Sequence, residues 1–480
     1  MANTRVERTE PPGLPRRGLL LGAGALAAGL AGAGPAAAQA VDWAGLRGRL
    51  RGSLALPGEP EFGSAKALFD PRFDEFAPAG VVAAATAGDV RAAAGFAREH
   101  EMPLAVRAGG HSYVGASASP GALVVDVRGL RDITVDADLV TVGAGVTTFR
   151  ALSELARSGQ ALPVGSCPTV GLAGLTLGGG IGVDSRRYGL TCDRLLGAEV
   201  VLPNGATART SAGELAGLFW ALRGAGGTIG IVTSLTYRAH PAVARDIVRL
   251  TFPGRAAARV LTGWARWMPA AAHTVWATVE VSTAGDGLGC AAVVVAPAGE
   301  GAGAATALAA AAGVVPESTE QRTLDPMAAA RHLGGGETTP RSAKVAGSDI
   351  LAQLSPATAD AIVGTIAGRA RSGATGYVLV DPLDGAVRDL PADATAFPWR
   401  SHAACLQWIV EAPEDTDEAR DWIRDAHTAL GAATSGGYVN YAEPDNTPAR
   451  CYGTNAPRLH TLRRAVDPGG RLRTGLRTTP

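Results

Sequence analysis

A histidine stands directly after two glycines in the stretch VRAGGHSYVGAS, residues 106–117. Glycine lets a backbone come close to another group because it has no Cβ. The imidazole of His111 adds a nucleophilic ring nitrogen at the same place. The stretch therefore predicts a loop that lies closely against a bound molecule, with a histidine able to react with it.

A second stretch, GSCPTVGLAGLTLGGGIGVDSRRYGL at residues 165–190, is richer still in glycine. Its glycines are too close together for a plain strand or helix, and they predict a backbone wrapped around a flat or phosphorylated ligand. It also carries Cys167, and a thiolate is a strong nucleophile. The stretch contains neither GxxxxGK[ST] nor a GxGxxG that follows a strand, so it is neither a P-loop nor a Rossmann fingerprint.

Several other chemistries lack their motifs. HExxH and GxSxG are absent, and the eight histidines include no close pair, which argues against a metal site and against two common hydrolase classes. The five cysteines form no CxxC pair, which argues against a zinc ribbon and a disulfide framework. We therefore expect no metal.

Composition indicates a globular protein with a small-molecule partner. The chain has 480 residues, 46% hydrophobic and 18% charged, which is enough for two or three domains with large cores. Its 44 basic residues balance its 44 acidic residues, so no net field draws it to nucleic acid or to an anionic membrane.

Residues 1–40 have the pattern of a twin-arginine signal peptide. Arg16 and Arg17 precede a short apolar run, and Ala38-Gln39-Ala40 forms an A-x-A cleavage pattern. The alternative, a membrane anchor, needs roughly 20 apolar residues, and this run is shorter. We expect a secreted or extracytoplasmic protein that is free of the membrane after cleavage. Twin-arginine export carries folded proteins, often with a cofactor already bound.

Two regions of different pattern follow a lead-in at residues 41–75. Over residues 76–245, short apolar strands alternate with helices, and DITVDADLVTVGAG predicts a hairpin. Over residues 246–430, longer strands with period-two alternation and alanine-rich helices predict an antiparallel sheet covered by helices. Residues 431–480 return to glycine, tyrosine and asparagine motifs. The predicted fold class is α+β.

These motifs together resemble the berberine bridge enzyme-like branch of the vanillyl-alcohol oxidase and p-cresol methylhydroxylase (PCMH) flavoprotein superfamily. The resemblance runs from about residue 68 to the C-terminus and rests on shared order and spacing. It implies a PCMH-type FAD-binding domain of two α+β subdomains at residues 76–245, a substrate domain at 246–430 and a C-terminal segment at 431–480 that returns to the FAD domain. The motifs are R-x-G-G-H-S-Y at Arg107–Tyr113, G-x-C-P-T-V-G at Gly165–Gly171, G-G-G-x-G at Gly178–Gly182, R-x-Y-G-L at Arg186–Leu190, F-W-A-L-R-G from Phe219, G-I-V-T at Gly230–Thr233, Y-V-N-Y at Tyr438–Tyr441 and D-P at Asp467-Pro468.

The resemblance implies FAD as the cofactor. Backbone N–H groups of residues 107–112 would bind its diphosphate, because a nest of amides suits an anion. His111 would bond to the flavin 8α-methyl and Cys167 to flavin C6, so we expect a bicovalent flavin. The alternatives are a histidine that is only hydrogen-bonded and a small buried cysteine. The implied FAD-binding residues are Arg107, Ala108, Gly109, Gly110, His111, Ser112, Cys167, Gly171, Gly174, Gly178, Gly179, Gly182, Ile231 and Asn440.

The Y-V-N-Y motif lies on a predicted strand, so Tyr438 and Asn440 are expected to point one way and Tyr441 the other. In the family a tyrosine here often takes the proton of the substrate hydroxyl while hydride leaves for flavin N5, provided that its surroundings lower its pKa. Either tyrosine is a candidate for this role, and packing is the alternative for one of them. Gln407 matches a polar position that faces the pocket. Tyr438, Tyr441 and Gln407 are therefore the candidate catalytic residues, with His402 and Glu411 nearby.

Two departures from the family's pattern bear on the pocket and on the electron acceptor. Trp399 stands where many relatives have histidine, and Leu172 occupies a position that borders the space where oxygen meets the reduced flavin. A bulky side chain there can exclude oxygen by packing.

The predicted function is an exported FAD-dependent oxidoreductase that takes hydride from a carbinol or amine carbon of a sugar or secondary metabolite, with oxygen as acceptor and hydrogen peroxide as product. The alternatives are a dehydrogenase with another acceptor and a non-catalytic protein that binds flavin or ligand. The sequence does not choose among substrates.

Overall fold

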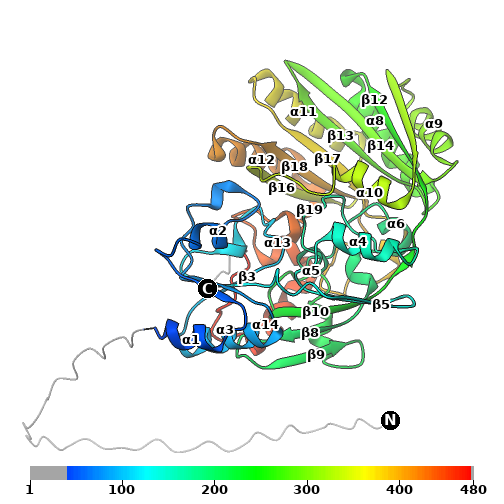
Figure 1. Ribbon diagram of the computed structural model, residues 1–480. Coiled ribbons are helices and arrows are strands. Elements are labelled where there is room, and N and C mark those ends of the chain that lie inside the picture. Colours follow the sequence, from blue (N-terminus) through cyan, green and yellow to red (C-terminus); the bar gives the residue numbers. More distant parts are fainter. Residues whose placement is uncertain (1–40, 477–480) are drawn as a thin grey trace, which may run out of the picture. The chain divides into compact units, whose positions relative to one another are not determined.

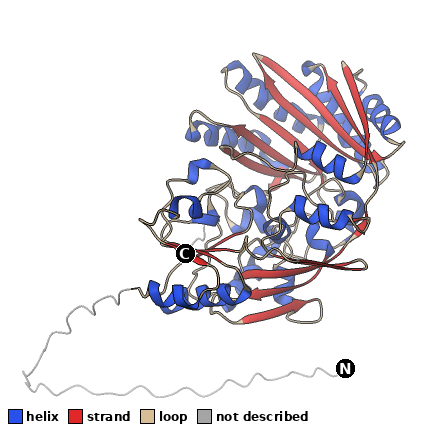
Figure 2. Ribbon diagram, in the orientation of Figure 1, coloured by secondary structure: helices blue, strands red, loops and turns tan. Residues whose placement is uncertain are grey.

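The computed structural model describes residues 41–476, and the predicted signal peptide at residues 1–40 lies outside them. From Trp43 onward the chain forms three sheets of four or more strands and one two-stranded ribbon within the described residues (Figures 1 and 2). The ribbon pairs β7 (Gln160–Ala161) with β11 (His240–Pro241). The predicted α+β class is confirmed.

The first sheet has the order β1-β2-β4-β3. Strands β2 (Gly80–Ala83), β4 (Leu123–Asp126) and β3 (Leu104–Arg107) run parallel, and β1 (Ser53–Ala55) joins them antiparallel. Helix α3 (Ala87–Glu99) makes the crossover, and it begins where the Thr86 hydroxyl accepts a hydrogen bond from the Asp89 amide. The predicted lead-in thus supplies an edge strand of this sheet.

The second sheet has the order β5-β6-β10-β8-β9 and is antiparallel throughout. The predicted hairpin is confirmed as β5 (Ile133–Asp136) and β6 (Leu139–Gly143). The Asn204-Gly205 turn joins β8 (Leu195–Val201) to β9 (Thr207–Ser211), and β10 (Ile231–Arg238) lies at the centre. These two sheets carry the glycine-rich segments in the connections between their strands.

The third sheet is larger and antiparallel. Its eight strands, in spatial order, are β15 (Ser318–Leu324), β12 (Arg245–Phe252), β14 (Gly287–Pro297), β13 (Trp276–Ala284), β17 (Tyr377–Pro382), β18 (Ala404–Glu411), β16 (Lys344–Leu351) and β19 (Thr434–Gly436). One face packs against α8 (Ala257–Trp267), α9 (Gly301–Ala312), α11 (Pro356–Arg371) and α12 (Thr416–Leu430) in the largest apolar core (Figure 2). The predicted antiparallel sheet covered by helices is confirmed.

The other face of the third sheet packs against the glycine-rich part of the chain. Ile350 on β16 and Cys405 on β18 share a buried cluster with Leu190, Phe397 and Tyr438. Helix α10 (Pro326–Gly334) lies on this side and packs against β12 and β13 through Ala329. Because both faces are covered, β18 is buried along Ala404–Val410, and its side chains on this second face are available to line a site.

The remaining helices lie around the first two sheets. They are α1 (Trp43–Arg49), α2 (Phe62–Lys66), α4 (Thr148–Ala156), α5 (Leu172–Leu177), α6 (Ser185–Tyr188), α7 (Ala216–Ala221), α13 (Pro448–Tyr452) and α14 (Ala456–Val466). Near the C-terminus, Leu472 forms a parallel bridge with Leu104 on β3. Residues after α14 thus return to the first sheet.

The prediction that Y-V-N-Y lies on a strand is wrong. Strand β19 ends at Gly436, and residues Val439–Tyr441 form a 3₁₀ turn in which the Tyr441 amide donates to the Tyr438 carbonyl at 2.8 Å. The turn is set by contacts with distant segments, described below, which a local alternation pattern does not reveal.

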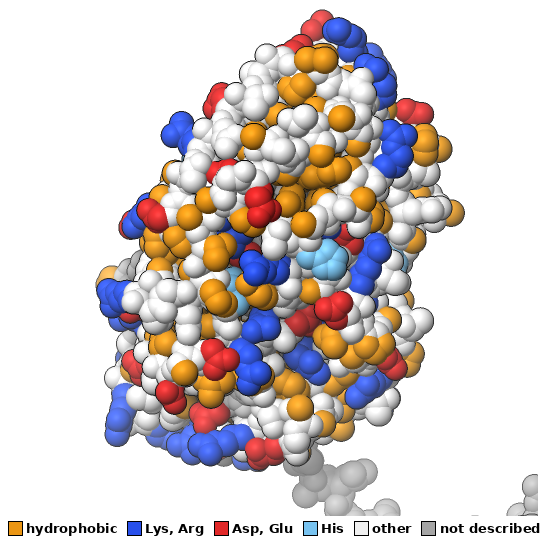
Figure 3. Space-filling view, turned by 90° about the vertical axis from the view of Figure 1, so that its right-hand side faces the viewer, with side chains coloured by type: hydrophobic (Ala, Val, Ile, Leu, Met, Phe, Trp, Pro, Cys, Tyr) orange, Lys and Arg blue, Asp and Glu red, His pale blue; other side chains and the backbone are white. Residues whose placement is uncertain are grey.

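Within residues 41–476, no helix combines the length and the apolar character that crossing a membrane requires. On the face drawn in Figure 3, acidic and basic side chains are interspersed, in line with the balanced charge of the chain.

Candidate functional site

A cavity of about 450 Å³ lies between the glycine-rich segments and the third sheet. On one side it is lined by residues from 106–117 and 165–181, which we call the glycine wall. On the other side it is lined by Gln407 and Ile409 of β18 and by residues 438–442, which we call the side-chain wall. Most of the residues predicted to bind FAD or to act in catalysis meet here.

In the glycine wall, the backbone at Gly109 lies in contact with the backbone at Gly171. A Cβ atom on Gly109 would lie 2.2 Å from the Gly171 nitrogen, and one on Gly171 would lie 2.4 Å from the Gly109 nitrogen. Gly110, next in the chain, has a φ of +73°, which glycine adopts without strain. By contrast, a Cβ on Gly174 would meet no protein atom within 4 Å, and Gly174 is an exposed residue that lines the cavity. The wall therefore presents backbone to whatever the cavity holds.

His111 follows this contact and is held from two sides. Its Nε2 lies 3.0 Å from the Thr169 hydroxyl, and its ring stacks on Phe69 with centroids 4.0 Å apart. Burial lowers the pKa of His111 to about 4. The imidazole is therefore neutral at physiological pH, and a neutral ring nitrogen is a nucleophile.

Cys167 lies beside the same threonine. Its Sγ is 3.9 Å from the Thr169 hydroxyl and 3.5 Å from the Thr339 hydroxyl. Thr148, in the first turn of α4, fixes the segment by donating to the Cys167 carbonyl at 2.7 Å. Cys167 is partly exposed, whereas the other four cysteines are buried and all five are free. Thr169 thus contacts both predicted points of flavin attachment.

Tyr438 and Asn440 connect the side-chain wall to the glycine wall. The Tyr438 hydroxyl accepts hydrogen bonds from the Gly180 amide and from Asn440 Nδ2, both at 2.8 Å. Asn440 Nδ2 also donates to the Leu175 carbonyl at 3.0 Å. A Cβ on Gly178 would lie 2.0 Å from Asn440 Oδ1, so this glycine makes room for the asparagine. These contacts fix the turn that the sequence alone predicted as a strand.

Tyr441 is more accessible than Tyr438 and packs edge-on against it, with ring centroids 4.9 Å apart. Burial, and next the charge of Asp381, raise the pKa of Tyr441 well above its ordinary value. Asp381 lies on β17, and burial raises its own pKa to about 6. The expected catalytic role requires a tyrosine of lowered pKa, and burial has the opposite effect on both Tyr438 and Tyr441.

Gln407 projects from β18 into the cavity, and its Nε2 donates to the Tyr113 hydroxyl at 2.9 Å. Burial raises the pKa of Tyr113, so this phenol stays protonated. Gln407 therefore bridges the two walls.

Five of the predicted FAD-binding residues do not line the cavity. They are Arg107, Gly178, Gly179, Gly182 and Ile231. The buried Arg107 guanidinium donates to Asp126 at 2.6 Å and to the Ala67 carbonyl at 3.1 Å, so its side chain connects β3 to β4. Its distance from the cavity follows from strand alternation, which points its side chain away from the loop that it precedes.

The residues that depart from the family's pattern, and the two nearby candidates, also lie away from the cavity lining. Leu172 is fully buried, and its neighbours Ala173 and Gly174 line the cavity instead. Trp399 donates to the Gly437 carbonyl at 3.2 Å and packs beneath the chain that leads to Tyr438. Glu411 pairs with Lys344 at 2.7 Å, and His402 packs on Trp399.

Sequence reasoning missed several residues of the site. Tyr113 and Thr169 stand inside the quoted motifs, so the motifs themselves were a signal. Asp381 is the charged residue of the strand YVLVDP, next to its last residue, and that position was a weaker signal. Thr339 and Lys344 line the cavity from outside any motif.

Comparison with known proteins identifies a cofactor-binding domain and similar enzymes. The family described as FAD binding domain matches residues 78–211, which include the whole glycine wall. The FAD-linked oxidoreductase YgaK of Bacillus subtilis (strain 168) is 29% identical over 432 residues, covering 88% of this chain and 95% of that protein. The chain therefore carries a FAD-binding domain and is similar over most of its length to a FAD-linked oxidoreductase.

Solved structures have the same fold as this chain. Chitooligosaccharide oxidase superposes with a TM-score of 0.83 at 21% identity, covering 91% of this chain and 99% of that one. Berberine bridge enzyme from Eschscholzia californica superposes with a TM-score of 0.79 at 20% identity, covering 89% and 96%. These two likenesses show the fold. The FAD-binding domain and the FAD-linked oxidoreductase relatives show that FAD is the cofactor and that the chain is an enzyme of the FAD-linked oxidase and dehydrogenase class.

The cavity fits a flavin dinucleotide by its chemistry. Among the described residues that line it there is no Asp or Glu, while Lys344 and Arg473 contribute positive charge. The Thr474 hydroxyl, also in the lining, is buried without a hydrogen-bond partner in the protein. A diphosphate supplies the acceptors that such groups lack, and the bare backbone of the glycine wall accommodates a flat ring system.

Proposed function

We propose that this berberine bridge enzyme-like oxidoreductase carries its FAD on two covalent bonds and takes hydride from a carbinol or amine carbon of a sugar or secondary metabolite. The observation that supports this most directly is the convergence of His111 and Cys167 on the hydroxyl of Thr169 in one cavity. A protein that only bound flavin would not require two nucleophiles placed in this way. The chitooligosaccharide oxidase neighbour is named for a sugar substrate, which favours an oligosaccharide as the first class to test.

Different residues would hold the flavin ring and the diphosphate of the cofactor. His111, neutral at physiological pH, would bond to the flavin 8α-methyl, and the partly exposed Cys167 would bond to flavin C6. Backbone amides of residues 108–112 would bind the diphosphate, with positive charge from Arg473 close by.

Bound FAD supplies a two-electron acceptor: the substrate CH–OH loses a hydride from carbon and a proton from oxygen to become a carbonyl, and the two electrons pass on to oxygen, which leaves as hydrogen peroxide. Tyr441 lines the cavity and packs on Tyr438. Its raised pKa keeps the phenol protonated, so it would accept the hydroxyl proton only while giving up its own. We propose Asp381 as the acceptor of the Tyr441 proton, since its charge acts on Tyr441 and its pKa of about 6 leaves it ionised above that pH. Gln407 orients the substrate by hydrogen bonding.

We further propose oxygen as the acceptor and export as the destination. Ala173 rather than the bulkier Leu172 borders the cavity, and a small side chain leaves room for oxygen. The twin-arginine pattern of residues 1–40 supports export of the folded, flavin-loaded protein.

The test starts with the purified protein denatured in acid. We expect flavin fluorescence to stay with the polypeptide on a denaturing gel. It should persist in His111→Ala and in Cys167→Ala, and leave the chain in the double variant. Cys290→Ala, at a buried thiol in the third sheet, is the matched control and should retain both bonds.

Release of flavin from the native chain would refute covalent attachment. If flavin is retained but no peroxide forms with any alcohol or amine, reduction of an artificial acceptor separates the dehydrogenase from a non-catalytic flavin protein.

A further inference from the structure

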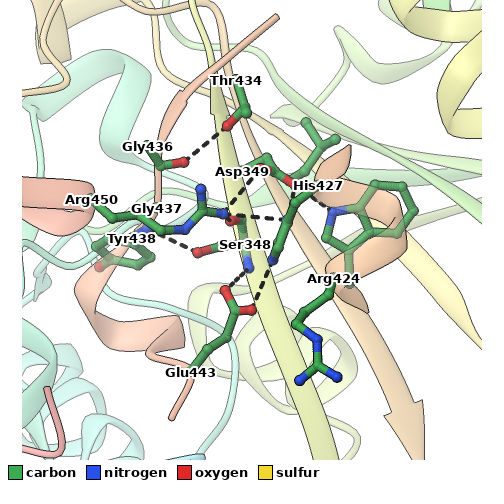
Figure 4. A network of polar contacts seen from close by, with 12 residues as sticks. Ser348, Asp349, Arg424, His427, Thr434, Gly436, Gly437, Tyr438, Glu443 and Arg450 are labelled. Carbon is green, nitrogen blue, oxygen red and sulfur yellow. Dashed lines mark hydrogen bonds and ion pairs between the residues drawn. The ribbon is translucent and has the colours of Figure 1, made fainter. Parts of the chain in front are cut away.

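A network of charged side chains lies behind the turn that carries Asn440 and Tyr441 (Figure 4). We call it the His427 network, and its members come from four separate elements. They are Ser348 and Asp349 on β16, His427 on α12, Glu443 after the 3₁₀ turn and Arg450 on α13. None of these five described residues lines the cavity.

His427 lies between two carboxylates. Its Nδ1 is 2.7 Å from Asp349 Oδ2, and its Nε2 is 2.8 Å from Glu443 Oε2. A neutral imidazole has a single N–H, so it can donate to only one of these oxygens. Both distances are satisfied only by the imidazolium, which donates from both nitrogens. Burial alone would lower the pKa of His427, but the hydrogen bonds to Asp349 and Glu443 outweigh it and raise the pKa to about 9.

The network is electrically balanced when His427 is charged. Arg450 Nη2 lies 3.1 Å from Asp349 Oδ1 and 3.3 Å from His427 Nδ1, so the two cations share the fully buried Asp349. Trp408 adds a neutral donor to Asp349 at 2.8 Å. The charged groups that face the ring are therefore Asp349 on β16, Glu443 beyond the turn and Arg450 on α13. Loss of the imidazolium proton would leave one buried negative charge uncompensated.

This network holds the turn at both ends. At its start the Tyr438 amide donates to the Ser348 hydroxyl at 2.9 Å. At its end Glu443 accepts from the Ser348 amide at 3.2 Å and from His427. Asn440 and Tyr441 lie between these two points and line the cavity. Gly347 leaves the space that Glu443 fills, because a Cβ there would lie 2.6 Å from Glu443 Cδ.

We propose that His427 is a positioning residue of the active site, which holds Glu443 against β16 and thereby fixes the turn that presents Asn440 and Tyr441. Its effect on turnover rests on the proposed function, whereas its effect on the order of the turn does not. His427 touches neither cavity nor ligand, so it acts only through the turn.

The first experiment is hydrogen–deuterium exchange of the peptide spanning residues 438–446 in the purified holoenzyme. We expect His427→Gln to speed its exchange by about tenfold or more, because one end of the turn is released. His460→Gln, at an exposed histidine on α14, is the control and should exchange like the native protein. Turnover should fall by about 10²-fold in kcat with little change in KM, since a displaced Tyr441 affects the reaction more than binding.

The pH dependence gives a readout that a simple packing role would not produce. A histidine whose pKa is raised in the folded protein stabilises the fold below its ordinary pKa and loses that effect as pH rises through about 9. Relative to the control at each pH, the native turn should therefore loosen near pH 9, and His427→Gln should show no such transition. His427→Lys should restore part of the order and shift the loss upward, because lysine titrates near about 10.4.

Folded, flavin-loaded His427→Gln with unchanged exchange over residues 438–446 would overturn the proposal. If that variant does not fold, Gly347→Ala decides the matter, because without changing any charge it displaces Glu443, together with Ile423 of α12, whose Cγ2 would lie 2.6 Å from the new Cβ. Faster exchange in Gly347→Ala supports the network, and native exchange refutes it. If no form of the protein turns over a substrate, the proposed function fails while the exchange data still decide the role of His427.

Discussion

One wall of the cavity exposes backbone atoms, and the other exposes side chains. The glycine wall presents backbone, and its sequence is constrained wherever two chains touch, as at Gly109 and Gly171. The side-chain wall presents Gln407, Tyr438 and Tyr441, held by contacts from distant segments. A backbone surface requires glycine at fixed positions, whereas a side-chain surface requires only that the right groups meet in space. The matching family region, residues 78–211, contains the first wall and not the second.

This contrast predicts that adding a Cβ to a single glycine of the glycine wall disrupts cofactor binding by the whole wall. Gly109→Ala should abolish flavin retention and lower the free energy of unfolding by about 3 kcal/mol or more, because the new Cβ meets the Gly171 backbone. Flavin content and denaturant unfolding measure the two effects. Gly95→Ala on α3, where a Cβ meets nothing within 4 Å, should be stabilised by about 0.5–1 kcal/mol. A flavin-loaded Gly109→Ala protein would show that the backbones need not touch.

A substitution in the side-chain wall should lower the catalytic rate without releasing the flavin. Tyr441→Phe should keep its flavin and its melting temperature but lose about 10²–10⁴-fold in kcat, since the proton of the substrate hydroxyl has no acceptor. Steady-state kinetics normalised to bound flavin give the result. Tyr188→Phe, at a tyrosine stacked on His240 outside the cavity, should keep its full rate. Native activity in Tyr441→Phe would move the role to another residue.

Replacing Asp381 should raise the stability of the protein and lower its activity. Its pKa is raised to about 6, so its contribution to stability is full below its ordinary pKa and is lost as pH rises through about 6. Asp381→Asn removes that loss and should stabilise the protein at pH 8 by about 1–3 kcal/mol. Its kcat should fall by about tenfold or more, and the acidic limb of the native pH profile near pH 6 should disappear. A lower melting temperature at pH 8 would contradict this account.

The smallest expected effect is that of Leu172→Ala on the reaction of reduced flavin with oxygen, because Leu172 lies behind the residues that line the glycine wall. Leu172→Ala should cost about 2–5 kcal/mol of stability because the side chain is fully buried. Its reduced flavin should react with oxygen at a rate within about twofold of native, since Leu172 does not line the cavity. Ala173→Leu, at the neighbouring lining position, should slow that reaction, and stopped-flow reoxidation measures both. A large change in Leu172→Ala alone would show that this side chain controls oxygen access.

The sequence was most informative where local chemistry fixes local structure. The hairpin at residues 133–143, the antiparallel sheet with its helices and the pairing of His111 with a glycine loop all follow from short patterns. The Y-V-N-Y motif shows the limit. Its residues fit a strand by alternation, yet contacts with Gly178 and Gly180 bend it into a turn. Arg107 and Asp381 show the same limit. Only the packing of distant strands reveals that Arg107 connects two strands and that, besides burial, the charge of Asp381 raises the pKa of Tyr441.

The return of the chain near Leu472 to the first sheet has a consequence for biosynthesis. Arg473 and Thr474 line the same cavity as residues 106–113, which the ribosome makes several hundred residues earlier. During synthesis the growing chain therefore has a glycine wall before it has the means to enclose a cofactor. The cavity is therefore complete only after residue 474 has emerged and the chain has folded back onto the first sheet.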